Sequence, residues 1–110
     1  MRVMGPNLDQ HIIGWYKMVE QHRPMGKPAW KHTKTDTWIY CMPNHRWGIA
    51  NQDERYLEFD STEAWVYSNE MEQDMPQSVG RWFRDNGHKF VHDSEIEVSV
   101  SSEEAERKAL

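Results

Sequence analysis

Six histidines give this 110-residue chain its clearest potential for metal chemistry. His88 and His92 are four residues apart and precede Asp93, so the two rings would share one face of a strand or a helix. A zinc site, however, needs three or four converging ligands, and the chain has one cysteine and no Cys-x-x-Cys or His-Glu-x-x-His motif. We therefore expect structural or surface roles for the histidines, with no bound metal and no cofactor.

Carboxylates and nucleophiles are the other residues that could support chemistry. The run Glu70-x-Glu72-x-Asp74 offers oxygen ligands for calcium, but it lacks the glycine and the later glutamate of an EF-hand loop. No Gly-x-Ser-x-Gly elbow, phosphate-binding loop or dinucleotide fingerprint occurs. Cys41 lies within the apolar run 38–42, which favours a buried, inert thiol over a nucleophile. The sequence therefore predicts that the protein is not an enzyme.

Charge is unevenly distributed along the chain. The net charge of −5 and the pI of about 5.6 argue against nucleic acid as the main partner, because phosphate binding needs concentrated Lys and Arg. Between residues 11 and 50 six basic residues stand against two acidic ones, and between residues 51 and 75 one basic residue stands against eight. Two solvated faces would explain this asymmetry, and so would a charge dipole that orients a partner. We expect a protein partner and no nucleic acid.

Apolar stretches are short throughout the chain. None approaches the roughly 18–20 residues that cross a bilayer, and residues 1–6 have no signal-peptide hydrophobic region. A single cysteine excludes an intrachain disulfide and argues against a disulfide-stapled secreted scaffold. We expect a soluble, cytoplasmic protein without a membrane span.

The chain is poor in branched aliphatic residues and rich in rings. Leu, Ile and Val together number 15, fewer than the 13 aromatic residues and 7 methionines combined. The rings recur in short β-rich runs between turn residues, so we expect them to form the core of an all-β domain. Its expected form is a small antiparallel sandwich or barrel of seven to eight strands, spanning residues 11–100. Residues 1–10 are expected to form an N-terminal extension and residues 101–110 a short C-terminal helix or tail.

Turn residues make three local predictions. Residues 43–45 (Pro-Asn-His) join two β-runs in a first hairpin, and Asn86-Gly87 joins two further runs in a second. Gly14 lies in the middle of the run 11–19, where a glycine suggests a bulge or a close approach of the backbone to another group.

The order of the aromatic and turn residues has a further implication. The segments that form this order are Gly14-Trp15-Tyr16, Trp38-Ile39-Tyr40, Arg46-Trp47-Gly48-Ile49, Ala64-Trp65-Val66-Tyr67 and Gly80-Arg81-Trp82. Over about residues 11–82 this series resembles the Trp/Tyr-rich β-repeat modules of single-celled eukaryotes, although Gly48 precedes Ile49 here rather than following it. The resemblance implies a β fold and an accessory or interaction module, since these modules have no assigned activity.

Aromatic rings that the core does not need would be free to bind a partner. Strand alternation places Trp38 and Tyr40 on one face of the first hairpin and Ile39 on the other. The residues that we predict to form a binding stripe are Trp30, Trp38, Tyr40, Trp47 and Trp65. Core filling is the alternative for each of these rings. We predict a non-catalytic protein-interaction or adaptor module that uses the stripe and the polarised charge, with a carbohydrate- or small-ligand-binding domain as the alternative.

Overall fold

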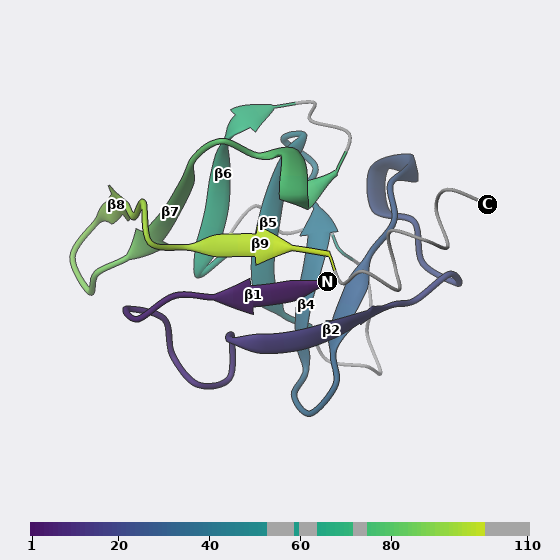
Figure 1. Cartoon of the computed structure of the whole chain (residues 1–110). Helices are drawn as coiled ribbons and strands as arrows, with labels where there is room; N and C mark the ends of the chain where they lie inside the picture. Colours follow the sequence, from purple (N-terminus) through teal and green to yellow (C-terminus); the bar gives the residue numbers. More distant parts are fainter. Residues whose placement is uncertain (53–58, 60–63, 72–74, 101–110) are drawn as a thin grey trace.

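The computed structural model describes residues 1–52, 59, 64–71 and 75–100, and this part of the chain forms one curled antiparallel sheet (Figure 1). Its nine strands are β1 (Arg2–Met4), β2 (Gly14–Met18), β3 (Trp30–His32), β4 (Thr37–Cys41), β5 (Arg46–Asn51), β6 (Val66–Met71), β7 (Trp82–Asp85), β8 (Phe90–His92) and β9 (Glu97–Ser99). They lie in the order β8-β7-β6-β5-β4-β3-β2-β1-β9. Two short 3-10 turns are η1 (Pro24–Gly26) and η2 (Pro76–Ser78). The all-β prediction is confirmed, with nine strands in the described residues instead of the expected seven to eight.

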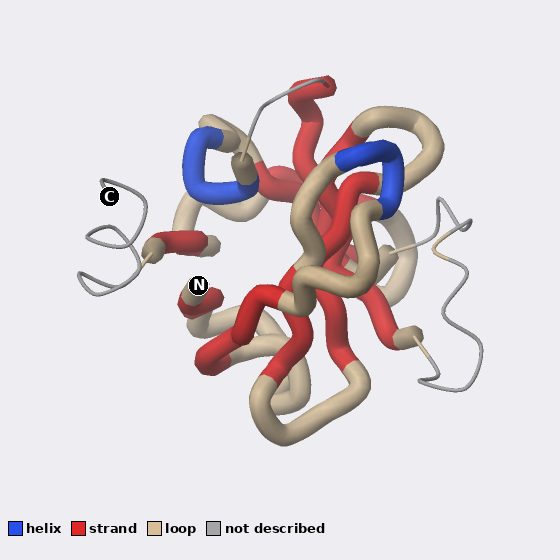
Figure 2. The backbone as a smooth tube through the Cα atoms, turned by 90° about the vertical axis from the view of Figure 1, so that its right-hand side faces the viewer, coloured by secondary structure: helices blue, strands red, loops and turns tan. Residues whose placement is uncertain are grey.

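One additional strand comes from the N-terminal segment. β1 pairs with both β2 and β9, so that Val3 and Val98 are direct partners although they lie at opposite ends of the domain sequence. In both backbone views β1 and β9 lie side by side (Figures 1 and 2). The segment 1–10, expected as an extension, therefore contributes a strand to the sheet, and its Met1 and Val3 are fully buried. The helix expected at residues 101–110 lies outside the described residues.

Both predicted hairpins are present. The β4–β5 turn bends at His45, whose φ of 67° suits the left-handed position of a short hairpin loop. In the β7–β8 turn, Gly87 has a φ of 94°, and the Oδ1 atom of Asn86 accepts hydrogen bonds from the backbone N–H groups of His88 and Lys89, each at 2.9 Å. The bonds of Asn86 and the backbone conformation of His45 are both local to their turns. This is why the turn residues alone predict both hairpins.

Hydrophobic side chains are buried on both faces of the sheet, and every residue of β4 is buried. The first core cluster includes Val3, Tyr16, Trp30, Ile39, Cys41, Trp47, Ile49, Val66, Trp82 and Val98. The second cluster consists of Ala29, Trp38, Tyr40, Met42, Ala50 and Phe59. Since the first cluster draws on every described strand except β8, the sheet must curl around it. The alternation predicted for Trp38, Ile39 and Tyr40 is confirmed.

Strand β2 changes its pairing partner along its length. Gly14 and Trp15 pair with β1, whereas Tyr16 and the residues after it pair with β3. The change takes place between Trp15 and Tyr16. The strand begins at Gly14, whose φ of 129° is a conformation that L-residues rarely adopt.

The ring of His32 packs directly on this glycine. The backbone N–H of Lys34 donates to Nδ1 of His32 at 3.0 Å, so the Nε2 atom carries the proton and donates to the Ile13 carbonyl at 2.8 Å. A Cβ at Gly14 would lie 2.9 Å from that Nε2 atom. The close backbone approach that the sequence suggests at Gly14 is therefore confirmed.

A buried carboxylate connects the N-terminal segment to the other end of the sheet. The Oδ2 atom of Asp93 accepts hydrogen bonds from Nε of Arg84 at 2.8 Å and from Nδ2 of Asn7 at 3.2 Å, and its Oδ1 atom accepts one from the Glu95 backbone at 2.9 Å. Burial alone raises the pKa of Asp93, but these hydrogen bonds and the Arg84 charge outweigh burial and lower the pKa below its ordinary value.

We expect Gly14→Ala to lower the free energy of unfolding by about 2–4 kcal/mol, because it combines a strained φ with a methyl group against the His32 ring. Gly87→Ala is the matched control, since Gly87 also has a positive φ but a Cβ there meets no atom within 4 Å. Its loss should be about 1 kcal/mol. Urea unfolding followed by tryptophan fluorescence measures both variants, and equal losses would contradict the close approach at Gly14.

Asp93→Asn removes the carboxylate charge and should cost about 1–3 kcal/mol of stability at pH 7, because Arg84 loses its ionic partner. The folded pKa of Asp93 lies below the unfolded value of about 3.9, so its stabilisation is present above that value and is lost as the pH falls through the folded pKa. The difference between wild type and variant should therefore shrink below about pH 4. Urea unfolding at successive pH values tests this, and a constant difference down to about pH 2 would refute it.

Candidate functional site

The structure corrects the expected surface stripe, because four of its five rings are core residues. Trp30, Trp38, Tyr40 and Trp47 are each at most 2% exposed, and Trp65 is partly exposed. Trp30 contacts Trp47 in the first core cluster, with ring centroids 5.8 Å apart, whereas Trp38 and Tyr40 belong to the second cluster. The rings therefore lie on opposite faces of the sheet, and because both faces are covered, no common surface presents them.

The most exposed aromatic ring among the described residues is Trp15, which is 48% exposed. It lies on β2 directly opposite Arg2 of β1, and the Arg2 guanidinium carbon is 5.4 Å from the centre of its ring. Lys17 is exposed two residues further along β2 and therefore shares the face of Trp15. We call Arg2, Trp15 and Lys17 the basic tryptophan patch.

The two cations of the basic tryptophan patch, Arg2 and Lys17, form no ion pair within the described part of the chain. Glu97 is exposed on β9 opposite Met4, so it is a diagonal neighbour of Arg2 on the same face of the sheet. One sequence signal could have identified the patch, because Lys17 marks one face of β2 as solvent-exposed and Trp15 is on that face.

A second group of rings lies across β6, β7 and β8. Tyr67 and Phe83 are stacked at 5.5 Å with an angle of 10° between their planes, and Phe90 contacts Tyr67 edge-on at 4.7 Å. The Arg46 guanidinium carbon lies 5.6 Å from the centre of the Tyr67 ring. Because Arg46 and Phe83 come from the strands on either side of β6, both faces of Tyr67 are covered. This group serves to join neighbouring strands and offers no free Tyr67 face to a ligand.

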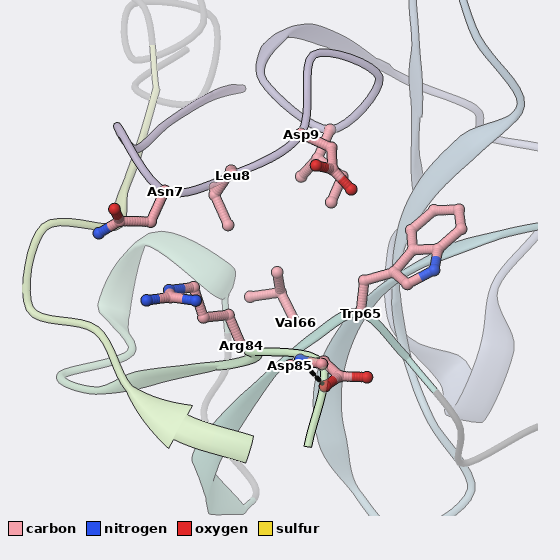
Figure 3. A pocket seen from close by; sticks show the side chains of 9 residues that line it. Asn7, Leu8, Asp9, Trp65, Val66, Arg84 and Asp85 are labelled. Carbon is pink, nitrogen blue, oxygen red and sulfur yellow. Dashed lines mark hydrogen bonds between the residues drawn. The ribbon is translucent and has the colours of Figure 1, made fainter. Parts of the chain in front are cut away.

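Trp65, the remaining ring of the expected stripe, lies at a surface hollow of about 200 Å³ (Figure 3). Residues that line the hollow include Asn7, Leu8, Asp9, Trp65, Arg84 and Asp85. Figure 3 shows the carboxylates of Asp9 and Asp85 on the two sides of the Trp65 ring, with Arg84 and Asn7 at the opposite end. The N-terminal segment and the β6 and β7 strands thus bring together an aromatic ring, acceptors and donors.

The described groups that the sequence raised for metal or nucleophile chemistry are dispersed, whereas Glu72 and Asp74 of the acidic run lie outside the described residues. His88 lies in the β7–β8 turn and His92 packs on Phe83 with ring centroids 5.6 Å apart. In the residues that the structure covers, no three His, Cys, Asp or Glu side chains gather in a way that could hold a metal ion. Cys41 is buried, and burial raises the pKa of its thiol more than the nearby Lys27 charge lowers it. A thiol with these properties is a poor nucleophile.

Trp15→Phe should remove most of the tryptophan emission that acrylamide quenches in the folded protein, because Trp15 is far more exposed than the core rings. Trp47→Phe is the control and should leave the quenchable fraction unchanged, since Trp47 is 1% exposed. Stern–Volmer titrations of the three proteins in native buffer test this. Loss of quenching in the Trp47 variant would contradict the burial described above.

Comparison with known proteins gives no relative to guide the assignment. No protein-family model, no curated protein and no solved structure matches the chain. Within the described residues, no helix has the length and apolar character that a membrane crossing requires. The functional assignment therefore depends on the surfaces described above.

Proposed function

We propose that this protein is a non-catalytic interaction module that binds an acidic segment of a partner protein at the basic tryptophan patch. The observation that carries the proposal is the exposed Trp15 ring, with the Arg2 guanidinium over it and Lys17 beside it on β2. Trp and Arg are the residue types that contribute most to binding energy at protein interfaces, because they combine large contact area with polar or charged groups.

The charge of the patch favours an acidic partner. Arg2 and Lys17 form no ion pair with a described residue, so carboxylates of a bound segment can pair with both. Such charges accelerate association and orient the partner. Nucleic acid is disfavoured, because the chain carries a net charge of −5 and eight acidic residues between positions 51 and 75.

A catalytic role receives no support from the chain's lone thiol. Cys41 is buried, and burial raises the pKa of its thiol, so that the reactive thiolate is disfavoured. An adaptor with a protein partner best fits both the exposed Trp15 ring and the polarised charge of the chain.

Capture of partners from a native extract by immobilised protein tests the proposal, with mass spectrometry to identify what is retained. We expect Trp15→Ala to reduce capture of a specific acidic partner at least about tenfold, because an aromatic anchor is lost. Lys17→Glu should also reduce it, and raising the salt from about 50 to 500 mM should weaken binding of the wild type.

Met25→Ala is the matched control, since Met25 is also exposed but lies in η1 rather than on β2. This variant should retain the partner as the wild type does. The proposal fails if wild type, Trp15→Ala and Lys17→Glu retain the same proteins in the same amounts at low salt.

A further inference from the structure

We propose that the hollow beside Trp65 binds a single sugar ring and prefers an amino sugar over a neutral or an acidic one. This site is separate from the basic tryptophan patch. Three parts of the chain enclose it: the N-terminal segment, the start of β6 and the end of β7 (Figure 3). It therefore adds a small-ligand site to the proposed interaction module.

The Trp65 ring is held in a fixed position at the edge of the hollow. The backbone N–H of Trp65 donates to the Ile49 carbonyl at 3.1 Å, and its carbonyl accepts from the backbone N–H of Asp85, also at 3.1 Å. The ring of His11 packs against the indole at 4.5 Å with an angle of 80°. A ring fixed in this way can stack on a ligand without losing further conformational freedom.

The composition of the hollow matches the two kinds of surface that a sugar ring presents. The Trp65 ring and the Leu8 side chain offer apolar contact to C–H groups (Figure 3). Around them, Asp9 and Asp85 offer hydrogen-bond acceptors, and Arg84 offers donors, so that hydroxyl groups can both donate and accept.

The charge of the hollow selects among sugars. Arg84 is already paired with Asp93 at 2.8 Å, so its charge is compensated. Asp9 and Asp85 form no ion pair with a described residue, and Asp85 uses its Oδ1 atom to accept from the Gly87 backbone, which leaves Oδ2 for a ligand. Two uncompensated carboxylates attract a protonated amine and repel a phosphate or a carboxylate.

The size of the hollow limits the ligand to one ring. Its volume of about 200 Å³ lies below the range of about 300–1,000 Å³ that is typical of drug-sized ligands. A site of this size, open to solvent on one side, should bind a monosaccharide with a dissociation constant of the order of 1 mM.

Two-dimensional NMR titration of the whole chain with three sugars of the same ring size, one cationic, one neutral and one anionic, tests the proposal. The probes are glucosamine at about pH 6, where its amine is protonated, glucose, and glucuronate. We expect glucosamine to shift the Trp65 indole N–H signal, glucose to bind about three- to tenfold more weakly, and glucuronate to cause no shift at the same concentration. The indole N–H signal that is missing from the spectrum of Trp65→Phe is the signal of Trp65.

Variants separate this site from the patch and from a general cation site. Trp65→Ala should abolish the sugar-induced shifts, and Trp65→Phe should keep binding within about threefold. Asp9→Asn should weaken the preference for the amine, because only the Asp85 carboxylate then remains. Trp15→Ala is the control and should bind glucosamine as the wild type does, whereas Trp65→Phe should still capture the protein partner. The two proposals can therefore fail independently.

Three results would overturn the inference. The first is no shift of the Trp65 indole with any of the sugars at 10-fold the expected dissociation constant, about 10 mM. The second is equal or tighter binding of glucuronate. The third is binding of ethylammonium as tight as that of glucosamine, which would show a site for small cations rather than for a sugar.

Discussion

The pairing of β9 with β1 is the contact on which the rest of the structure depends. Eight strands follow one another as neighbours, but β9 returns to the first strand, with Arg2 opposite Ser99 and Met4 opposite Glu97. Such a pairing of distant segments costs loop-closure entropy, so it forms only if it buries enough apolar surface. The pairing of β1 with β9 buries this surface, because the curled sheet then surrounds a core that includes residues of every described strand except β8.

The unusual composition of the chain is explained by this curl. A curled sheet whose two faces are both covered needs bulky side chains on both, and here Trp30 and Trp47 fill one face while Trp38 and Tyr40 fill the other. Rings supply large apolar area per residue, which compensates for the small number of branched aliphatic residues. Where a ring packs against the backbone itself, the chain has a small residue. Gly14 lets the backbone of β2 pass close to the His32 ring.

The same constraint decides which rings remain for binding. Once the core has used four of the five rings expected in the stripe, the exposed or partly exposed tryptophans on the described surface are Trp15 and Trp65. Trp15 has cations beside it, and Trp65 has carboxylates beside it. The two surfaces therefore differ in the charge of the ligand that they favour, which is how one small domain can carry two separate binding proposals.

Local patterns in the sequence determined the class of the fold, the two hairpins, the alternation along β4 and the close approach at Gly14, because each depends on residues near one another in the chain or on one backbone conformation. Only the tertiary structure decided that Arg2–Met4 form a strand, since three residues have no readable periodicity and their partners are distant. It also decided which face of each strand meets solvent. Alternation separates the two faces of a strand but does not say which of them is covered, and in β4 both are.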